Sequence, residues 1–238
     1  MKLRTLLLLA ALAALPHIAS AARPRLIVQI VVGSMRAGDL ERYAENFEKG
    51  GFLRLRDGGV RYTDSRYDYQ QTVTPVSLAT LTTGAMPATH GVVGDRWRDY
   101  ADNAPVSLTA GWEGPGPYHL VAPTLAEALQ EQSPDSRIVT VAAEATSAVV
   151  TAGRGGDAYW LDSLRCDWES SRYYAEQLPD WVVRSNRERD NLVYADSEWH
   201  MLLNEYYYRN TRRRAIAPEP HNKKSGDGLR LRNGYERL

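Results

Sequence analysis

The chain has 238 residues, of which 43% are hydrophobic, and its formal net charge is zero. This length and apolar content are enough for one good core but short of two comfortable domains, so a single α/β domain is expected. Cys166 is the only cysteine, which excludes an internal disulfide and a cysteine-rich metal site. Any metal would therefore depend on Asp, Glu and His side chains.

Residues 1–21 predict a secretory signal peptide. A basic start is followed by an apolar run at residues 6–15 and by Ala19-Ser20-Ala21, a small-residue cleavage site. The alternative, a membrane anchor, needs about 20 apolar residues, and Pro16 and His17 cut the run short. The protein is expected to be exported, to the periplasm or the medium, without a stable membrane anchor.

Two strands and two helical segments are predicted next. Residues 25–33 are a near-continuous β-branched run, typical of a central parallel strand covered on both faces. Residues 40–47 have helical spacing and end before Gly50-Gly51. Residues 52–57 predict another helical turn, and residues 60–67 predict a second strand.

A helix is predicted at residues 74–83, because threonine is a good helix cap, proline is favoured at the first helical position and Gly84 stops the run. Residues 101–118, rich in Gly and Pro, predict a surface loop. A helix over residues 123–132 and a buried strand over residues 137–143 follow. Strands that alternate with helices indicate a three-layer α/β fold.

The C-terminal third differs in composition. From about residue 157 to Tyr208 the chain is rich in Trp and Tyr, which either line a binding wall or pack as a capping layer over the sheet. Residues 209–238 carry nine Lys or Arg against three acidic residues. This excess suggests an anionic partner or, given the surrounding Pro, Asn and Gly, a solvated and loosely ordered tail. No clear nucleic-acid partner is indicated.

Thr74 has two interpretations from chemistry alone. It is a helix cap, which is a common role of threonine, or a nucleophile held at a helix N-terminus. In an open α/β sheet, ligands lie beyond the carboxyl ends of the strands, where helix N-termini present free N–H groups. A hydroxyl there still needs activation, for which two divalent metals are the usual device in phosphoester displacement.

The stretch TVTPVSLATLTTGAMPATHGVVGDRW around Thr74 is the most specific motif of the chain. IVVGSMRAGDLERY and GGFLRL precede it, and YHLVAPTLAEAL, AVVTAGRGGDAYWLD and WESSRYYAEQLPDWV follow it. In this order the segments resemble the alkaline phosphatase superfamily, within it the type I phosphodiesterase/nucleotide pyrophosphatase-like branch and the secreted bacterial alkaline phosphatases that use threonine. The resemblance covers residues 24–208. It implies that residues 22–208 form the first half of a three-layer alkaline-phosphatase-like sheet, with helices on both faces, plus the aromatic capping segment.

The resemblance also implies roles for single residues. Thr74 aligns with the nucleophile, which would form a phosphothreonine intermediate beside two zinc ions, and His90 in the HG turn is expected to be structural. The metal-binding aspartate of the family corresponds to Gly33, which has no ligand to offer, and Asp39 is not expected to replace it. The phosphate-contacting asparagine corresponds to Asp95, the candidate substrate-binding residue, although a carboxylate would repel a phosphate dianion.

Other groups that the family uses are replaced or missing. The Lys-x-Arg pair that grips phosphate in phosphomonoesterases falls near Glu144-Ala145-Thr146, and diesterase members lack this pair. The later Asp and His metal ligands belong to a second half that this sequence lacks, so the chain resembles a truncated family member. Asp196 and His200 have metal-ligand spacing, but such a pair is usually solvated. His119 and His221 are interpreted as surface or loop histidines.

Two functional hypotheses follow. The first is an exported phosphoester hydrolase that acts on a small phosphoester, with Thr74 as nucleophile and two zinc ions as cofactors. In this hypothesis the rest of the metal site lies beyond Leu238 in a fuller gene product, and the 238-residue chain alone is impaired. The second is a non-catalytic binding or scaffold protein that retains the fold. Each zinc ion needs about three or four ligands, so this chain alone is not expected to hold the two ions.

Overall fold

A computed structural model describes residues 24–162, 164–189, 198–199 and 229–230. The chain divides into two compact units, Met1–Ala37 and Gly38–Leu238. Several predictions lie outside the described residues: the signal peptide at residues 1–21, nearly all of the tail at residues 209–238, the pair of Asp196 and His200, and His221.

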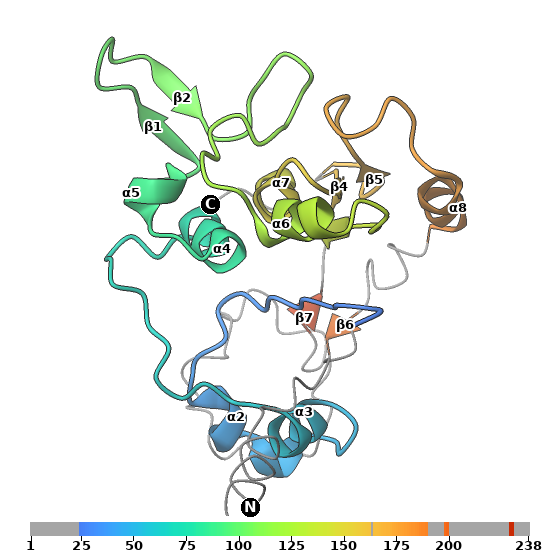
Figure 1. The fold of residues 1–238 in the computed structure, drawn as a ribbon. Helices are drawn as coiled ribbons and strands as arrows, with labels where there is room; N and C mark the ends of the chain where they lie inside the picture. The colour runs from blue at the N-terminus through green and yellow to red at the C-terminus, as the bar shows by residue number, and fades with distance from the viewer. Residues whose placement is uncertain (1–23, 163, 190–197, 200–228, 231–238) are drawn as a thin grey trace, which may run out of the picture. The chain divides into compact units, whose positions relative to one another are not determined.

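The second unit contains the helices and strands of the described residues (Figure 1). Its helices are α2 (Asp39–Arg42), the 3-10 turn η1 (Ala44–Asn46), α3 (Phe52–Gly58), α4 (Thr74–Thr83), α5 (Pro87–His90), α6 (Leu125–Gln132), α7 (Ala145–Ala152) and α8 (Asp180–Glu188). Its strands are β1 (Arg96–Arg98), β2 (Pro105–Ser107), β3 (Val139–Ala142), β4 (Asp157–Leu161), β5 (Trp168–Glu169), β6 (Glu198–Trp199) and β7 (Leu229–Arg230). No helix among the described residues is long and apolar enough to cross a membrane.

The largest sheet is mixed, with β3 parallel to β4 and β4 antiparallel to β5. On β4, Ala158 and Trp160 are buried with residues of α7. Tyr159 points to the opposite face, because side chains alternate along a strand, and its ring lies 5.1 Å from that of Trp181 in α8. α7 and α8 therefore cover opposite faces of the sheet, which confirms the predicted three-layer α/β arrangement.

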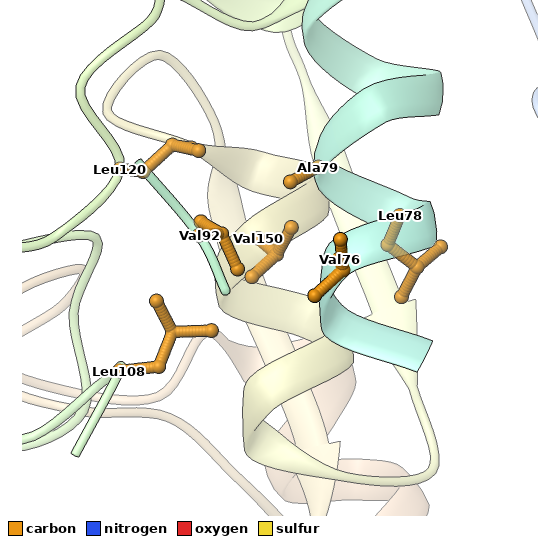
Figure 2. Packing of buried hydrophobic residues seen from close by; sticks show 7 residues of the cluster. All are labelled: Val76, Leu78, Ala79, Val92, Leu108, Leu120 and Val150. Carbon is orange, nitrogen blue, oxygen red and sulfur yellow. The ribbon is translucent and has the colours of Figure 1, made fainter. Parts of the chain in front are cut away.

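A hydrophobic core joins α4 and α7 to the segments that follow α5. Its buried side chains are Val76, Leu78, Ala79, Val92, Leu108, Leu120 and Val150. Figure 2 shows Val76 and Ala79 of α4 facing Val92 and Val150. Burying a valine or leucine side chain is worth about 1.5–3 kcal/mol, and this packing offsets the weak helix propensity of the threonines and valine in α4.

Side-chain hydrogen bonds hold α6 and α8 in place. Thr124 caps α6 in a capping box: its Oγ1 accepts from the N–H of Glu127 at 3.3 Å, and the Glu127 carboxylate accepts from the N–H of Thr124 at 2.9 Å. Asn186 of α8 bonds to both backbone groups of Trp168 in β5, accepting from its N–H at 2.7 Å and donating to its C=O at 2.8 Å. The second pair of bonds attaches a helix directly to a strand of the sheet.

The predicted central strand at residues 25–33 is wrong. These residues form no strand, and the apolar side chains of residues 26–32 are exposed, from 45% for Val31 to 78% for Leu26. A strand is stable only when neighbours take its backbone hydrogen bonds, and no described residue of the first unit does so. The β-branched run is therefore present without the pairing that its pattern predicts.

Two further strand predictions need correction. Residues 60–67 form no strand, and Val60 and Tyr62 are 84% and 82% exposed. The strand predicted at residues 137–143 exists as β3 but is not buried, because it pairs only with β4 among the described residues and leaves Val139 and Val141 exposed. The loop predicted at residues 101–118 includes the short strand β2. The helices predicted at residues 52–57, 74–83 and 123–132 are confirmed as α3, α4 and α6.

Candidate functional site

Thr74 is the first residue of α4 and does not cap it. Val73 takes the cap position, with an extended ψ of 155°, and Pro75 follows as the second helical residue. The first backbone bond of the helix runs from the N–H of Ser77 to the C=O of Val73 at 3.0 Å. Thr74 is exposed, and its hydroxyl makes no hydrogen bond within the described part of the chain. The capping prediction is therefore wrong, and the hydroxyl is left without a local structural role.

The surroundings of Thr74 favour an anion over a cation. The first N–H groups of a helix have no partner within the helix and carry a partial positive charge. α4 has no acidic residue in its first turn, so no carboxylate of that turn competes with a bound anion for these N–H groups. The helix ends at Gly84, which has φ of 68° and the left-handed conformation that favours glycine.

His90, predicted to be structural, is fully buried at the end of α5. Its Nδ1 accepts from the N–H of Val92 at 3.1 Å, and its Nε2 lies 3.2 Å from Oγ1 of Thr80. Because a peptide N–H can only donate, the ring proton is on Nε2 and is donated to Thr80. Burial lowers the pKa of His90, so the ring is neutral near pH 7. This geometry supports the structural interpretation.

Two residues connected to His90, Thr80 and Tyr69, have no signal in the sequence. Thr80 bonds to the ring, and the hydroxyl of Tyr69 lies 2.7 Å from Oγ1 of Thr80. Thr80 lies ten positions before His90, and Tyr69 lies eleven positions before Thr80. No helix or strand period joins either pair of positions. Only the folded arrangement brings them together.

Asp95, the candidate substrate-binding residue, is exposed in the turn before β1. Its backbone C=O accepts from the N–H of Leu108 at 2.9 Å. Within the described residues no hydrogen bond joins its carboxylate to Thr74. The structure thus places Asp95 at the surface but does not connect it with the candidate nucleophile.

Gly33, which by resemblance corresponds to the family's metal-binding aspartate, belongs to the first unit, where it is exposed in a turn. A Cβ atom added to Gly33 would meet nothing within 4 Å, so crowding does not demand glycine there. Among the residues that the structure describes, no three His, Cys, Asp or Glu side chains are grouped so that they could hold a metal ion.

Glu144, Ala145 and Thr146 begin a helix. Glu144 takes the N-cap position of α7, and its carboxylate accepts from the hydroxyl of Ser147 at 3.0 Å. A negative charge at a helix N-terminus is stabilising. The positions near which the family's Lys-x-Arg pair falls by resemblance therefore carry an acid that suits the helix N-terminus, and they supply no cation.

Aromatic residues of the capping segment mostly pack together. Tyr159 and Trp160 are buried, and the indole N–H of Trp160 donates to Glu169 at 2.7 Å. The rings of Tyr173 and Tyr174 meet edge-on at 4.8 Å. These contacts favour the packing interpretation over a binding wall for the described aromatic residues.

A polar hollow of about 270 Å³ lies near the starts of β3 and β4. It is lined by Tyr173, Tyr174, Arg137 and Arg154, together with Gln130, Ser136, Ile138, Gly155, Gly156 and Asp157. The guanidinium of Arg154 already donates to the C=O of Leu120 at 2.6 Å. Neither Thr74 nor Asp95 lines this hollow, so it is separate from the candidate site.

His119 lies in a loop, as predicted, but is half-buried. Its ring packs edge-on against Trp97 at 5.3 Å between centroids. This contact ties the loop after β2 to β1 and gives His119 a packing role.

Comparison with known proteins identifies the family. The sequence profile of the type I phosphodiesterase / nucleotide pyrophosphatase family matches residues 27–215. The chain belongs to this family. The matched range includes α4 with Thr74 and the sheet of β3, β4 and β5.

Individual proteins are also similar to this chain. A protein named calcium-transporting ATPase from Myroides odoratus is 30% identical over 193 residues, covering 76% of this chain and 35% of that protein. Alkaline phosphatase PafA from Elizabethkingia meningoseptica is 29% identical over 195 residues, covering 76% of this chain and 36% of PafA. The chain therefore spans about a third of the length of these relatives.

Solved structures of PafA share the fold. The wild-type crystal structure matches with a TM-score of 0.74 at 28% identity, over 81% of this chain and 40% of that one. A PafA mutant matches with a TM-score of 0.69 at 26% identity, over 73% of this chain and 36% of that one. In this mutant a threonine is replaced, and so is an asparagine that lies 21 residues after it. Thr74 and Asp95 have the same separation.

Proposed function

We propose that this chain is a phosphoester-hydrolase member of the type I phosphodiesterase family, with Thr74 in the position of the nucleophile and a small phosphoester as its substrate class. The observation that carries the proposal is the state of Thr74: an exposed hydroxyl with no hydrogen bond in the described chain, on the first residue of a helix inside the matched range. Its spacing to Asp95 supports the assignment, since the PafA mutant has substitutions at a threonine and an asparagine with that separation.

By family resemblance, two zinc ions would activate this hydroxyl and neutralise the phosphate charge. The described residues do not fit such ions. A zinc ion needs about three or four donor groups, but Gly33 has no side-chain donor and no group of three donors is present in the described part of the chain. The proposal therefore contains no step that depends on zinc.

Without activation, Thr74 is a weak nucleophile. Attack on phosphorus would form a bond from Oγ1 to phosphorus and release the alcohol, and the hydroxyl proton would have to pass to a base. No side chain of the described residues bonds to Thr74 as such a base. We therefore propose that residues 1–238 by themselves are impaired and do not turn over phosphoesters.

The test is an assay of the purified 238-residue protein with 4-nitrophenyl phosphate and bis(4-nitrophenyl) phosphate, with and without added zinc. The expected result is nitrophenol release at the uncatalysed rate for the wild type, Thr74→Ala and Thr74→Ser alike. Turnover by the wild type that Thr74→Ala abolishes and Thr74→Ser partly keeps would show that this chain carries a working site.

The second candidate is a non-catalytic binding or scaffold protein. It is favoured by Gly33, which has no side-chain ligand to offer at the position that, by family resemblance, carries a metal-binding aspartate. The two candidates differ in the response of the α4 N-terminus to a phosphoester analogue. A chemical-shift change at the amides of Thr74 and Val76 on adding phenylphosphonate supports the phosphoester site, and no change at millimolar concentration supports the scaffold.

Export is a separate proposal that rests on the signal pattern at residues 1–21. N-terminal sequencing of the protein recovered from a periplasmic fraction tests it. A mature chain that begins near Ala22 is expected, and a chain that keeps Met1 and stays with the cytosol contradicts export.

A further inference from the structure

The side chain of His90 connects several segments of the second unit. Its ring bonds to Thr80 of α4 and, through that hydroxyl, to Tyr69 in the stretch that leads to Thr74. Its Nδ1 holds the N–H of Val92. Its backbone C=O accepts from the N–H of Val121 at 3.0 Å. We call Tyr69, Thr80, His90 and Val92 the His90 chain.

The His90 chain leaves no room for a second proton on the ring. In the neutral ring Nε2 donates and Nδ1 accepts, and both positions are used. A proton added to Nδ1 would point at the hydrogen of the Val92 N–H, so that bond must break. Val92 is itself fully buried in the core with Val76 and Val150. Breaking its hydrogen bond to His90 would therefore disturb the packing of these side chains.

No side chain in the described part of the chain compensates a positive charge on the ring. α4 has no charged residue at all. The titratable side chains of the other segments in contact are those of Tyr67, Asp68 and Tyr69 before α4, of Asp95 after α5, and of His119 beside Val121. None of them forms an ion pair with His90 in the described part of the chain. A protonated ring would therefore be a buried charge without a partner, which is costly.

We propose that the His90 chain is an acid-sensitive latch, which holds the approach to Thr74 at residues 69–73 and the turn at residues 91–93 at neutral pH. When His90 is protonated, the lost bond to Val92 and the buried charge without a partner displace the ring from its site, so that its bond to Thr80 is lost as well and both segments are released. The inference does not depend on whether Thr74 reacts. It assigns to His90 a conformational role beyond filling the core, because the ring couples two segments that lie on either side of α4 in the sequence.

The experiment is amide hydrogen exchange of the full chain, followed by NMR as protection factors between pH 7.5 and 4.5. The amides of Thr72, Val92 and Val121 report on the latch, and the amide of Ala128, which bonds to Thr124 in α6 at 3.0 Å, reports on a distant helix. Protection of the three latch amides is expected to fall together with the titration of the His90 ring, while Ala128 stays protected. Loss of protection at all four amides at the same pH would mean global acid unfolding and would overturn the latch. So would unchanged protection at Val92 after the ring has titrated.

A variant at Thr80 tests the coupling without changing the histidine. Thr80→Val keeps the shape but removes the hydroxyl between His90 and Tyr69. The expected result at pH 7.5 is faster exchange at Thr72 with Val92 still protected. Thr83→Val is the matched control, because Thr83 is on the same helix and its hydroxyl bonds only locally, donating to the C=O of Ala79 at 2.6 Å and accepting from the N–H of Ala85 at 3.2 Å. Equal protection of Thr72 in the two variants would refute the coupling.

Discussion

Thr74 and Thr124 stand at the starts of helices, yet they use their hydroxyls differently. Thr124 Oγ1 accepts from the N–H of Glu127, while Thr74 bonds to nothing in the described chain. We expect Thr124→Ala to lower the free energy of unfolding by about 1 kcal/mol, the usual value of a lost cap. Thr74→Ala should change it by less than about 0.5 kcal/mol. Urea unfolding of both variants measures the difference, and equal losses would contradict the assignment of Thr124 as a cap and Thr74 as a residue without a capping role.

The position of Thr74 was predictable, but its local role was not. The motif around it places it at a helix start, which α4 confirms. Whether a threonine caps a helix or is its first residue depends on one residue of offset, here on the extended conformation of Val73, and sequence patterns do not resolve helix ends that closely. The partners of His90 were beyond prediction for a different reason, because Tyr69 and Thr80 reach the ring only through tertiary packing.

At the scale of elements, one polar side chain bonds α8 to the sheet. Asn186 makes two hydrogen bonds to the backbone of Trp168, so Asn186→Ala removes both and leaves the N–H and C=O of a strand without these partners. We expect a loss of about 1–3 kcal/mol in the free energy of unfolding. Arg184→Ala, at an exposed position of the same helix, is the control and should cost little. Thermal unfolding of the two proteins checks this, and a neutral Asn186→Ala would show that other contacts hold α8.

Helices were predicted better than strands because their signals are local. Gly84 and Thr124 mark the end of α4 and the start of α6 within a turn of the residues concerned. A strand needs a partner that the local pattern does not name. Residues 25–33 and 60–67 have the composition of strands but no pairing in the structure, whereas β3 has a partner in β4. The mistakes thus concern which segments pair, not which segments favour an extended chain.

At the scale of the whole molecule, His90 makes stability depend on pH. Burial lowers its pKa in the folded state, so the unfolded chain, with a pKa of about 6.5, binds the proton more strongly. Stability is therefore full above about pH 7 and decreases as pH falls through 6.5 toward the folded-state pKa. Asp57 and Asp162 also have lowered pKa values, because hydrogen bonds from the Arg56 side chain and from the backbone of Arg165 stabilise their charged forms, but these carboxyls act near pH 4 and below.

Urea unfolding at pH 7.5, 6.5 and 5.5 measures this dependence. His119→Gln should keep the loss of stability in acid, while His90→Gln should remove most of it. A wild-type stability that is constant between pH 7.5 and 5.5 would contradict the prediction.

The exposed apolar side chains predict self-association. Residues 26–32 are an uncharged, mostly β-branched run without proline, and their apolar side chains are exposed. Such runs pair with other chains. We expect the mass measured by light scattering to rise with protein concentration, and Ile30→Lys to reduce the rise by placing a charge in the run. Thr72→Lys adds the same charge at an exposed position outside it and should have no effect. A wild-type protein that stays monomeric at every concentration would contradict this.

The parallel pairing of β3 with β4 has a consequence for the order in which the chain folds. β3, α7 and β4 lie within 23 consecutive residues. The core that contains Val76 and Val150 closes a loop of 74 residues. Each doubling of a loop adds about 0.6 kcal/mol of closure entropy, so the longer loop costs about 1 kcal/mol more. The strand–helix–strand unit is therefore expected to form early and offer α7 as a surface on which α4 docks afterwards, so that Thr74 is among the last residues to reach its place.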